Sequence, residues 1–576
     1  MWTLVGIGLM WWSFRLTTFT SVTWTVPFLV LGNLWGIATV LASWLPDGVV
    51  NSQGRLARTF EWATAVLTVT LFVVWGVVST QGLAHYGTDA MAFNQYAAEL
   101  ARHGMNPYVH SMRPAYALFH ILPSGYTYSF TGAPVTALSY PSLSFLVYVP
   151  LLALGWTLNL APLVNIVAWG ITAALMFALS PRHLRPVALL LSGVGLYTAL
   201  TTGGVTDVLF LPLLTLAAYR WDRFGSSRWT YLGPLLFGLA MGIKQTPWPM
   251  LPFLLMALYL DQSDRTGPAD GLRRAGRYLA AVLVAFALPN LPYFFASPHA
   301  WIQGVLTPLL HSMVPTGQGT IALSLYLHMG GGSLTAFTLA TVLMFVLALV
   351  AFAGTYPLLR GAAWLLPGLA FFFASRSNVN YFIMLIPAGY IAATSVAPAT
   401  VTGATAAVTG SAAVRAAVRW FRSPRWAIAC AVLAAAFIAS AVYSLTAPAP
   451  LRIRLTAVQT AGSSDRVRQL TVRVTNTSGS SVTPAFDLLR AGANTSFWTV
   501  ASGPGRLASG QAATYTLLAP NADSEPSVQD TFSVIGFVAS PRSFSVSDEY
   551  DAGLYQLGTR SRHRGSRSLI IRFGSR

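Results

Sequence analysis

The chain has 576 residues, of which 54% are hydrophobic and only 9% are charged, and its mean hydropathy is +0.57. This composition excludes an ordinary soluble domain. Apolar runs reach the roughly 20 residues that a helix needs to cross a bilayer, so the sequence predicts a polytopic membrane protein. The net charge of +18 includes a single lysine, Lys244, among 35 basic side chains.

The apolar runs predict an all-α membrane domain of about 12 to 14 transmembrane helices. Arg15 interrupts the first run and no cleavage-type ending follows it, so we expect a retained helix and not a signal peptide. Residues 1–57 would be extra N-terminal helices, and residues 58–446 the main membrane domain with outer loops 84–140 and 298–333. The predicted spans lie near residues 1–20, 23–45, 61–83, 141–158, 160–180, 186–202, 205–220, 229–243, 245–260, 278–297, 334–357, 361–375, 380–398 and 426–446.

Arginine clusters indicate which loops face the cytoplasm. Short basic segments between spans lie inside by the positive-inside rule, so the charge reports topology and not nucleic-acid binding. These segments carry Arg55, Arg58, Arg182, Arg185, Arg220, Arg223, Arg228, Arg265, Arg273, Arg274, Arg277, Arg360, Arg415, Arg419, Arg422 and Arg425. Successive loops lie alternately inside and outside the membrane by this rule, except between residues 139 and 181. One of the two candidate spans there is expected not to cross fully. A single cysteine, Cys430, leaves no part for disulfides within the chain.

The pattern changes near residue 447. Leu470, Val472 and Val474 alternate with polar neighbours, and Gly, Ser, Asn and Pro clusters separate such strand-like runs. Residues 447–557 are therefore predicted to form a β-sandwich. The arginine-rich loop before span 426–446 places it outside, where it is expected to dock a polymeric acceptor. The basic tail, residues 558–576, either touches anionic lipid or wall polymer or is a solvated disordered end.

Few carboxylates remain for chemistry on the outer side. Nine Asp and Glu side chains precede residue 447, and the topology places only Asp89, Glu99 and Asp207 outside. Any outward-facing reaction that requires a carboxylate in the membrane domain must draw on these three.

Asp89 stands at the start of a predicted helix. Thr88 can serve as its N-cap and Gly104 as its stop, and apolar residues between them repeat at helical spacing, which indicates a short amphipathic helix at the outer interface. The free N–H groups of a first helical turn favour the ionised carboxylate, and this suits a general base. An Asp at a helix start can also serve the helix dipole alone, and that interpretation stays open.

Several short motifs follow Asp89 in order: Tyr96, then G-x-N-P-Y at 104–108 with Asn106 and Tyr108, then Tyr140 and Pro141, then GLAMGIKQTPWPMLP around Lys244. Together with the segment 201–220 around Asp207, this order resembles the integral-membrane glycosyltransferases of the GT-C superfamily, particularly the bacterial polyprenol-phosphate-mannose-dependent α-mannosyltransferases. The resemblance covers roughly residues 58–400. It implies a lipid-linked sugar donor, an inverting single displacement, and an Asp of the first outer loop as base, which here is Asp89.

One departure from that pattern concerns metal binding. Relatives that glycosylate proteins usually carry an acidic pair or a D-x-D in this loop, often with a metal, whereas Ala90 and Met91 follow Asp89 here. A divalent cation prefers several oxygen ligands, so we expect metal-independent chemistry and no cofactor beyond the polyprenyl-phosphate sugar itself.

Lys244 is the candidate partner of the donor phosphate. It falls at the outer turn between spans 229–243 and 245–260, where Pro247 and Pro249 disturb the helix. A leaving lipid phosphate develops charge that a lysine can stabilise, and the resemblance places a lysine at this position. The alternative is a lysine that snorkels to the head groups.

Further candidates surround these two residues. Arg376, in the outer segment between spans 361–375 and 380–398, is the second candidate phosphate ligand, with Asn378 or Asn380 as neutral substitutes. Asp207 is expected to orient the acceptor or Lys244, or only to start a helix. The candidate substrate-binding residues are Tyr96, Asn106, Tyr108, Tyr140, Asp207 and Asn380. The glycine-containing loop 298–333 is expected to act as a lid.

Histidines on the outer side raise a metal hypothesis that their spacing does not favour. No pair among them has the spacing that puts two ligands on one helix face, so we expect no metal site and interpret most of them as loop or interface residues. They are His85, His103, His110, His120, His299, His311 and His328.

The sequence therefore predicts a multi-pass glycosyltransferase of a bacterial cytoplasmic membrane, with membrane lipid, a polyprenyl-phosphate sugar and an extracytoplasmic glycan or glycolipid as partners. Mannose is the first choice of sugar, and arabinofuranose is the nearest alternative. A non-enzymatic flippase or exporter of lipid-linked glycans is an alternative of another class. A structural wall-anchoring protein is a third, and it leaves Lys244 and the ordered motifs without a purpose.

Overall fold

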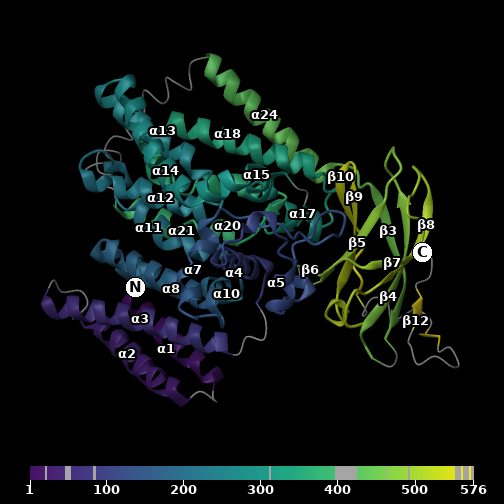
Figure 1. The fold of residues 1–576 in the computed structure, drawn as a ribbon, viewed down its shortest axis with the longest axis horizontal. Helices are drawn as coiled ribbons and strands as arrows, with labels where there is room; N and C mark the ends of the chain where they lie inside the picture. The colour runs from purple at the N-terminus through teal and green to yellow at the C-terminus, as the bar shows by residue number, and fades with distance from the viewer. Residues whose placement is uncertain are drawn as a thin grey trace.

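The structure is a computed structural model that describes residues 1–19, 23–45, 54–81, 86–310, 313–395, 424–461, 464–490, 493–551, 560–561 and 570–572. A large helical part is followed by sheets that lie together at one side of it (Figure 1). The helices are α1 Trp2–Arg15, α2 Val26–Trp44, α3 Arg55–Gln81, α4 Asp89–Arg102, α5 Arg113–Leu118, α6 Leu143–Leu146, α7 Val149–Ala153, α8 Leu160–Leu179, α9 Arg185–Ser192, α10 Gly195–Gly203, α11 Leu211–Ala218, α12 Leu232–Ile243, α13 Met250–Thr266, α14 Pro268–Ala296, α15 Pro298–Val305, α16 Thr307–Leu310, α17 Ile321–Tyr326, α18 Leu334–Leu359, α19 Pro367–Phe372, α20 Asn380–Ile383, α21 Ile386–Ser395 and α24 Pro424–Thr446.

The helical part contains helices that are long and apolar enough to cross a membrane, as in a membrane protein. Among the described residues there are six: Thr23–Trp44, Arg55–Gln81, Leu160–Leu179, Pro268–Ala296, Leu334–Tyr356 and Ala427–Thr446, with a seventh if the pair α9 and α10, bent by 52°, is one span. Other predicted spans correspond to shorter or broken helices, such as α6 and α7 where one incomplete crossing was expected. The total of about 12 to 14 crossings stays a prediction.

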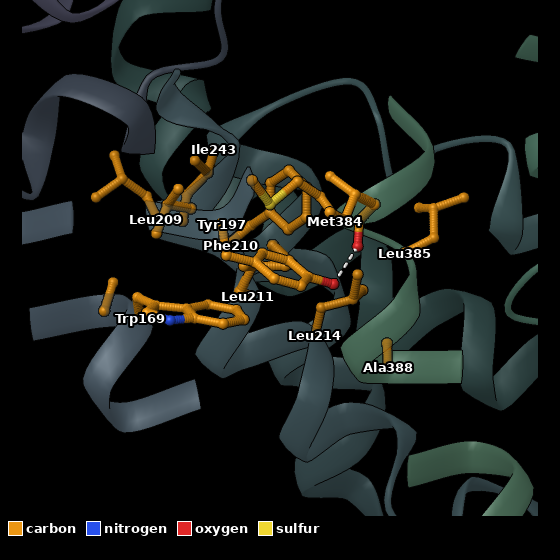
Figure 2. Packing of buried hydrophobic residues seen from close by; sticks show 14 of the residues in the cluster. Trp169, Tyr197, Leu209, Phe210, Leu211, Leu214, Ile243, Met384, Leu385 and Ala388 are labelled. Atoms are coloured by element: carbon orange, nitrogen blue, oxygen red, sulfur yellow. Dashed lines mark hydrogen bonds between the residues drawn. The ribbon is translucent and has the colours of Figure 1, made fainter. Parts of the chain in front are cut away.

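A buried hydrophobic core packs helices together that are distant in the sequence (Figure 2). Trp169 of α8 stacks on Tyr197 of α10 with 4.1 Å between ring centroids. The Tyr197 hydroxyl donates a 2.7 Å hydrogen bond to the carbonyl of Ile383, which joins α10 to the C-terminal end of α20. Phe210 is fully buried in the same cluster. The cluster contains Val208 and Ile243, which adjoin Asp207 and Lys244, and Ile383, which shares α20 with Asn380, so its packing fixes the backbones that carry those three polar side chains.

Ion pairs gather at the other end of the helices. Asp261 lies near the end of α13 that is remote from Lys244, and it pairs with Arg274 at 2.7 Å. Arg360 pairs with Asp222 at 2.6 Å. These arginines belong to the segments expected in the cytoplasm, and their pairing brings the loops of that end together.

The C-terminal part consists of two antiparallel sheets, with strand orders β10-β9-β5-β6 and β11-β12-β3-β4-β8-β7. The strands are β3 Leu451–Thr460, β4 Val467–Asn476, β5 Pro484–Arg490, β6 Ala493–Asn494, β7 Thr499–Ser502, β8 Ala512–Leu518, β9 Phe532–Ala539, β10 Arg542–Val546, β11 Arg560–Ser561 and β12 Ile570–Arg572. Val472 of one sheet and Phe486 and Val534 of the other belong to one buried cluster. We call residues 447–551 the sheet domain; its assignment as a β-sandwich stays a prediction.

Two expectations differ from the structure. Strand β12 of the basic tail pairs with β3, so the described part of the tail is not a solvated disordered end; the rest of the tail lies outside the described residues. In the described part of loop 298–333, β1 (Thr316–Gly317) pairs in parallel with β2 (Arg376–Ser377), and Val314 and Ile321 are buried. This segment is therefore packed against its neighbours and is not a separate lid, because its apolar side chains find partners in the sheet domain.

Candidate functional site

Asp89 is buried at the start of α4. Its side chain is 7% exposed, and its Oδ2 accepts a 2.6 Å hydrogen bond from the Thr127 N–H. Thr88 occupies the N-cap position as predicted, but its hydroxyl makes no cap bond and donates to the Gly204 carbonyl instead. Gly204 has φ +119°, and a side chain at this position would meet Thr88. The loop 86–88 is thus pinned to the end of α10, and this places the Asp89 carboxylate.

The surroundings of Asp89 differ from those expected of an interfacial helix. Most of α4 is buried, including Phe93 and Leu100, because the helix packs inside the helical part. Burial raises the pKa of Asp89 above 3.8, while the Thr127 hydrogen bonds and the Arg376 charge oppose the rise. The expectation that the helix start would favour the ionised form is corrected, since burial outweighs the favourable groups. A raised pKa brings the carboxyl nearer to the range in which general bases work.

Lys244 and Asp207 form a second polar centre. Helix α12 ends at Ile243, and Lys244 follows in an extended conformation (φ −153°). The break between α12 and α13 lies at Pro247 and Pro249, as predicted. Its ammonium donates to Asp207 Oδ2. Lys244 is 8% exposed and Asp207 is fully buried, so the protein itself encloses this lysine, contrary to the alternative of a lysine that snorkels to the head groups.

Two further side chains complete the coordination of Asp207. Asn380 Nδ2 donates to the same Oδ2 at 2.9 Å. Thr246 Oγ1 donates to Oδ1 at 3.2 Å. Three donors therefore surround the Asp207 carboxylate, and this carboxylate fixes the ammonium of Lys244 in one position.

Tyr140 connects the two centres. Lys244 Nζ lies 5.4 Å from the centroid of the Tyr140 ring and 5.9 Å from that of Tyr381, within the range of cation–π attraction. Burial raises the pKa of Tyr140 to about 12; the Lys244 charge opposes the rise, and Asp89 and Asp207 add to it. The Tyr140 hydroxyl therefore lies within electrostatic reach of both carboxylates.

The backbone that carries Tyr140 is held from three sides. The Tyr108 hydroxyl donates to the Tyr140 carbonyl at 2.7 Å. Gln245 Nε2 donates to the carbonyls of Ser139 and Val305 at 2.8 and 2.7 Å. On the other side, Asn290 Oδ1 accepts from the Ser142 N–H at 2.9 Å. Tyr108 thus acts on the site through the position of Tyr140.

Arg376 belongs to β2, and its charge acts on Asp89. Its guanidinium donates to the Val314 carbonyl at 3.2 Å, and its charge opposes the rise in the Asp89 pKa. The structure therefore brings Asp89, Arg376, Tyr140, Lys244, Asp207 and Asn380 together from distant parts of the sequence.

Two predicted substrate-binding residues have other surroundings. Tyr96 packs partly buried against the hydrophobic core of the helical part. The Asn106 side chain accepts from the Tyr108 N–H at 3.1 Å and caps a short helical turn. No described contact joins either residue to Asp89 or Lys244. Asn378 contributes its carbonyl to the turn before α20, and Asn380 is the asparagine that reaches Asp207.

Among the described residues, no three His, Cys, Asp or Glu side chains lie close enough together to hold a metal ion. His85 and His311 lie outside the described residues. His103 is exposed and lies 3.2 Å from Glu99 on the surface of α4.

Sequence reasoning missed three members of the site. Thr246 lies inside the motif around Lys244, and Tyr381 directly follows Asn380, so these positions were the available signal. Thr127 contributes a backbone N–H, and no feature of its side-chain type marks that role.

Comparison of the chain with models of known protein families and with curated proteins found no match. The resemblance to GT-C glycosyltransferases therefore depends on the short motifs alone, and the function is argued from the site.

Proposed function

We propose that the protein is a GT-C-type membrane glycosyltransferase, which moves one sugar from a polyprenyl phosphate to an extracytoplasmic glycan or glycolipid by inverting displacement. The observation that carries the proposal is the proximity of a buried carboxylate, Asp89, to a fixed ammonium, Lys244, across Tyr140. Displacement at a sugar phosphate requires a base for the acceptor hydroxyl and a cation for the leaving phosphate.

Asp89 is the general base in this mechanism. It takes the proton of the acceptor hydroxyl as the acceptor oxygen attacks the anomeric carbon. The bond between that carbon and the phosphate oxygen breaks, and its electron pair leaves with the polyprenyl phosphate. One negative charge thus moves from Asp89 to the leaving phosphate, and the total charge of the site does not change.

Lys244 and Arg376 stabilise the charge that develops on the phosphate. Asp207 accepts one hydrogen bond of the Lys244 ammonium, which has three N–H donors, so donors remain for a phosphate oxygen. Asn380 and Thr246 fix the Asp207 carboxylate, which holds the ammonium before the substrate arrives, so little reorganisation is needed during the reaction. Metal-independent chemistry fits this arrangement of protein cations.

Mannose is our first choice of sugar, and a bacterial cytoplasmic membrane is our first choice of location; the positive-inside pattern supports an outer position of the site and of the sheet domain. An arabinofuranosyl donor fits the same chemistry. A flippase or exporter moves the lipid-linked glycan intact, so it needs no base beside the anomeric carbon.

The test is to offer the purified protein in liposomes a panel of radiolabelled polyprenyl-phosphate sugars, including mannose and arabinofuranose. We expect release or transfer of label from one of them. Movement of intact donor across the bilayer, without release from any sugar, would replace the proposal by the exporter.

A further inference from the structure

A hairpin of residues 127–135 separates the sheet domain from Asp89. The Val135 N–H donates to the Thr127 carbonyl at 2.8 Å, and the Ser129 N–H donates to the Ala133 carbonyl at 2.9 Å. The first residue of this hairpin supplies the N–H that binds the Asp89 carboxylate. Any shift of the hairpin therefore acts directly on the base.

The tip of the hairpin is clamped by aromatic residues of the sheet domain. The Phe130 ring meets the Phe537 ring edge to face, with centroids 5.1 Å apart. The Tyr128 and Phe497 rings lie 5.5 Å apart. Gly132 has φ +85°, and a Cβ at this position would come within 2.9 Å of the Phe497 ring. The contact thus needs glycine on one side, where it packs against an aromatic ring on the other.

The same hairpin reaches Arg376 by a second route. The Tyr128 carbonyl accepts from the Val314 N–H at 3.0 Å, and the Val314 carbonyl accepts from Arg376 at 3.2 Å. Asn494 of the sheet domain donates to the Pro315 carbonyl at 3.3 Å. The sheet domain is therefore connected through short hydrogen-bonded paths to Asp89 and to Arg376.

We propose that the sheet domain is a positioning element of the Asp89 site, in which Phe497 and Phe537 hold the hairpin so that the Thr127 N–H stays on Asp89. This inference rests on the proposed glycosyltransferase function. It implies that transfer to a small soluble acceptor needs the sheet domain as much as transfer to a polymer does. A sheet domain that only docked polymeric acceptors would leave small-acceptor transfer unchanged.

The experiment compares two leucine variants of the full-length protein in liposomes. Phe497→Leu removes the ring that faces the hairpin. Phe532→Leu is the matched control, because Phe532 is 1% exposed and packs on Tyr550 inside the sheet domain, away from the hairpin. If stability of the sheet domain alone mattered, the fully buried Phe532 would be the more damaging position. Phe497→Tyr keeps the ring and serves as the rescue.

With a small soluble acceptor, Phe497→Leu is expected to lower kcat on the order of 10-fold, since small misplacements of a base are costly. The acid limb of kcat/KM should move to higher pH, because the Thr127 hydrogen bond favours the charged form of Asp89. Phe532→Leu and Phe497→Tyr should stay near the wild-type values. Wild-type kcat and acid limb in Phe497→Leu, or equal losses in both leucine variants, would overturn the inference.

Amide hydrogen exchange at Thr127 gives a readout that needs no reaction. Exchange should be faster in Phe497→Leu and unchanged in Phe532→Leu. If the wild type transfers no sugar while exchange responds in this way, the proposed glycosyltransferase chemistry fails, but the link between Phe497 and the Thr127 N–H stands. If the wild type transfers sugar and Thr127 stays protected in Phe497→Leu, the link fails and the chemistry stands.

Discussion

Lys244 and Asp207, 37 positions apart in the chain, form a buried ion pair in which the carboxylate also accepts hydrogen bonds from Asn380 and Thr246. The pair lies where α12 ends, so the only lysine of the chain is fixed and not mobile. A fixed cation beside an aromatic ring and near a second carboxylate is the feature on which the functional proposal depends.

Substitutions of this pair can separate substrate binding from folding. Lys244→Gln leaves Asp207 charged and buried without its cation, which should cost about 3–5 kcal/mol of stability. The double variant Lys244→Gln with Asp207→Asn removes both charges and should recover most of that stability. Donor binding should stay weak in both variants, as measured by titration with the donor lipid in detergent or liposomes.

The matched control uses the ion pair at the other end of the helices. Arg360→Gln with Asp222→Asn removes a comparable pair and should leave donor binding intact. Tight donor binding in the double variant of Lys244 and Asp207 would remove Lys244 from phosphate recognition. Lys244→Arg keeps the charge on a longer, planar group and should restore function only in part.

Arg376 should set the pH dependence of the reaction. Its charge lowers the pKa of Asp89 against the effect of burial, so Arg376→Gln should raise that pKa further. The base is active when deprotonated, and the acid limb of kcat/KM should therefore move to higher pH. Arg376→Lys should move it less.

Arg113→Gln is the control for Arg376, because Arg113 is exposed and its charge acts on Tyr126 and not on Asp89. If kcat/KM fell at the same acidic pH in the wild type and in Arg376→Gln, Arg376 would not act on the base.

The sheet domain should become less stable as the pH rises. Asp487 is 1% exposed, and burial raises its pKa from 3.8 to about 7. Between these values the folded protein binds more protons than the unfolded chain, so the free energy of unfolding falls from about pH 4 to about pH 7 and changes little above. Pulse proteolysis of the full-length protein in urea at pH 5 and pH 8 should show lower stability of this domain at pH 8.

Asp487→Asn should abolish most of this pH dependence, since the amide is neutral throughout and its oxygen can accept from the Leu488 N–H and the Thr495 hydroxyl. Asp548→Asn, at an exposed position, should leave the dependence in place. If the stability of the sheet domain changed with pH equally in the wild type and in Asp487→Asn, other groups would cause the pH dependence.

Local sequence signals located much of the site before its geometry was known. Thr88 and Gly104 bracket α4 as the capping pattern predicts, and the prolines after Lys244 mark the break between α12 and α13. The alternation around Val472 predicts strand β4. In each case the signal lies within one turn or strand, where residue type alone restricts the backbone.

The remaining features depend on contacts between distant segments. Asp207 was expected to serve one of several roles, and only the fold shows that its carboxylate meets Lys244. The burial of Asp89 depends on the packing around α4, and the sequence of α4 alone indicated an interfacial helix. The Thr127 N–H reaches Asp89 across 38 positions through a backbone group, so no side-chain pattern predicts it.

Single-turnover transfer by Asp89→Asn tests the central claim most directly. The purified variant is placed in liposomes with the labelled donor that the wild type uses, and both donor affinity and the rate of label transfer are measured, with Glu99→Gln on the exposed face of α4 as control. The account predicts a rate lower by about 10²-fold or more, the loss typical of a missing general base, with donor affinity close to wild type. A near-normal rate in Asp89→Asn would contradict the account, because no base would then be needed at this position.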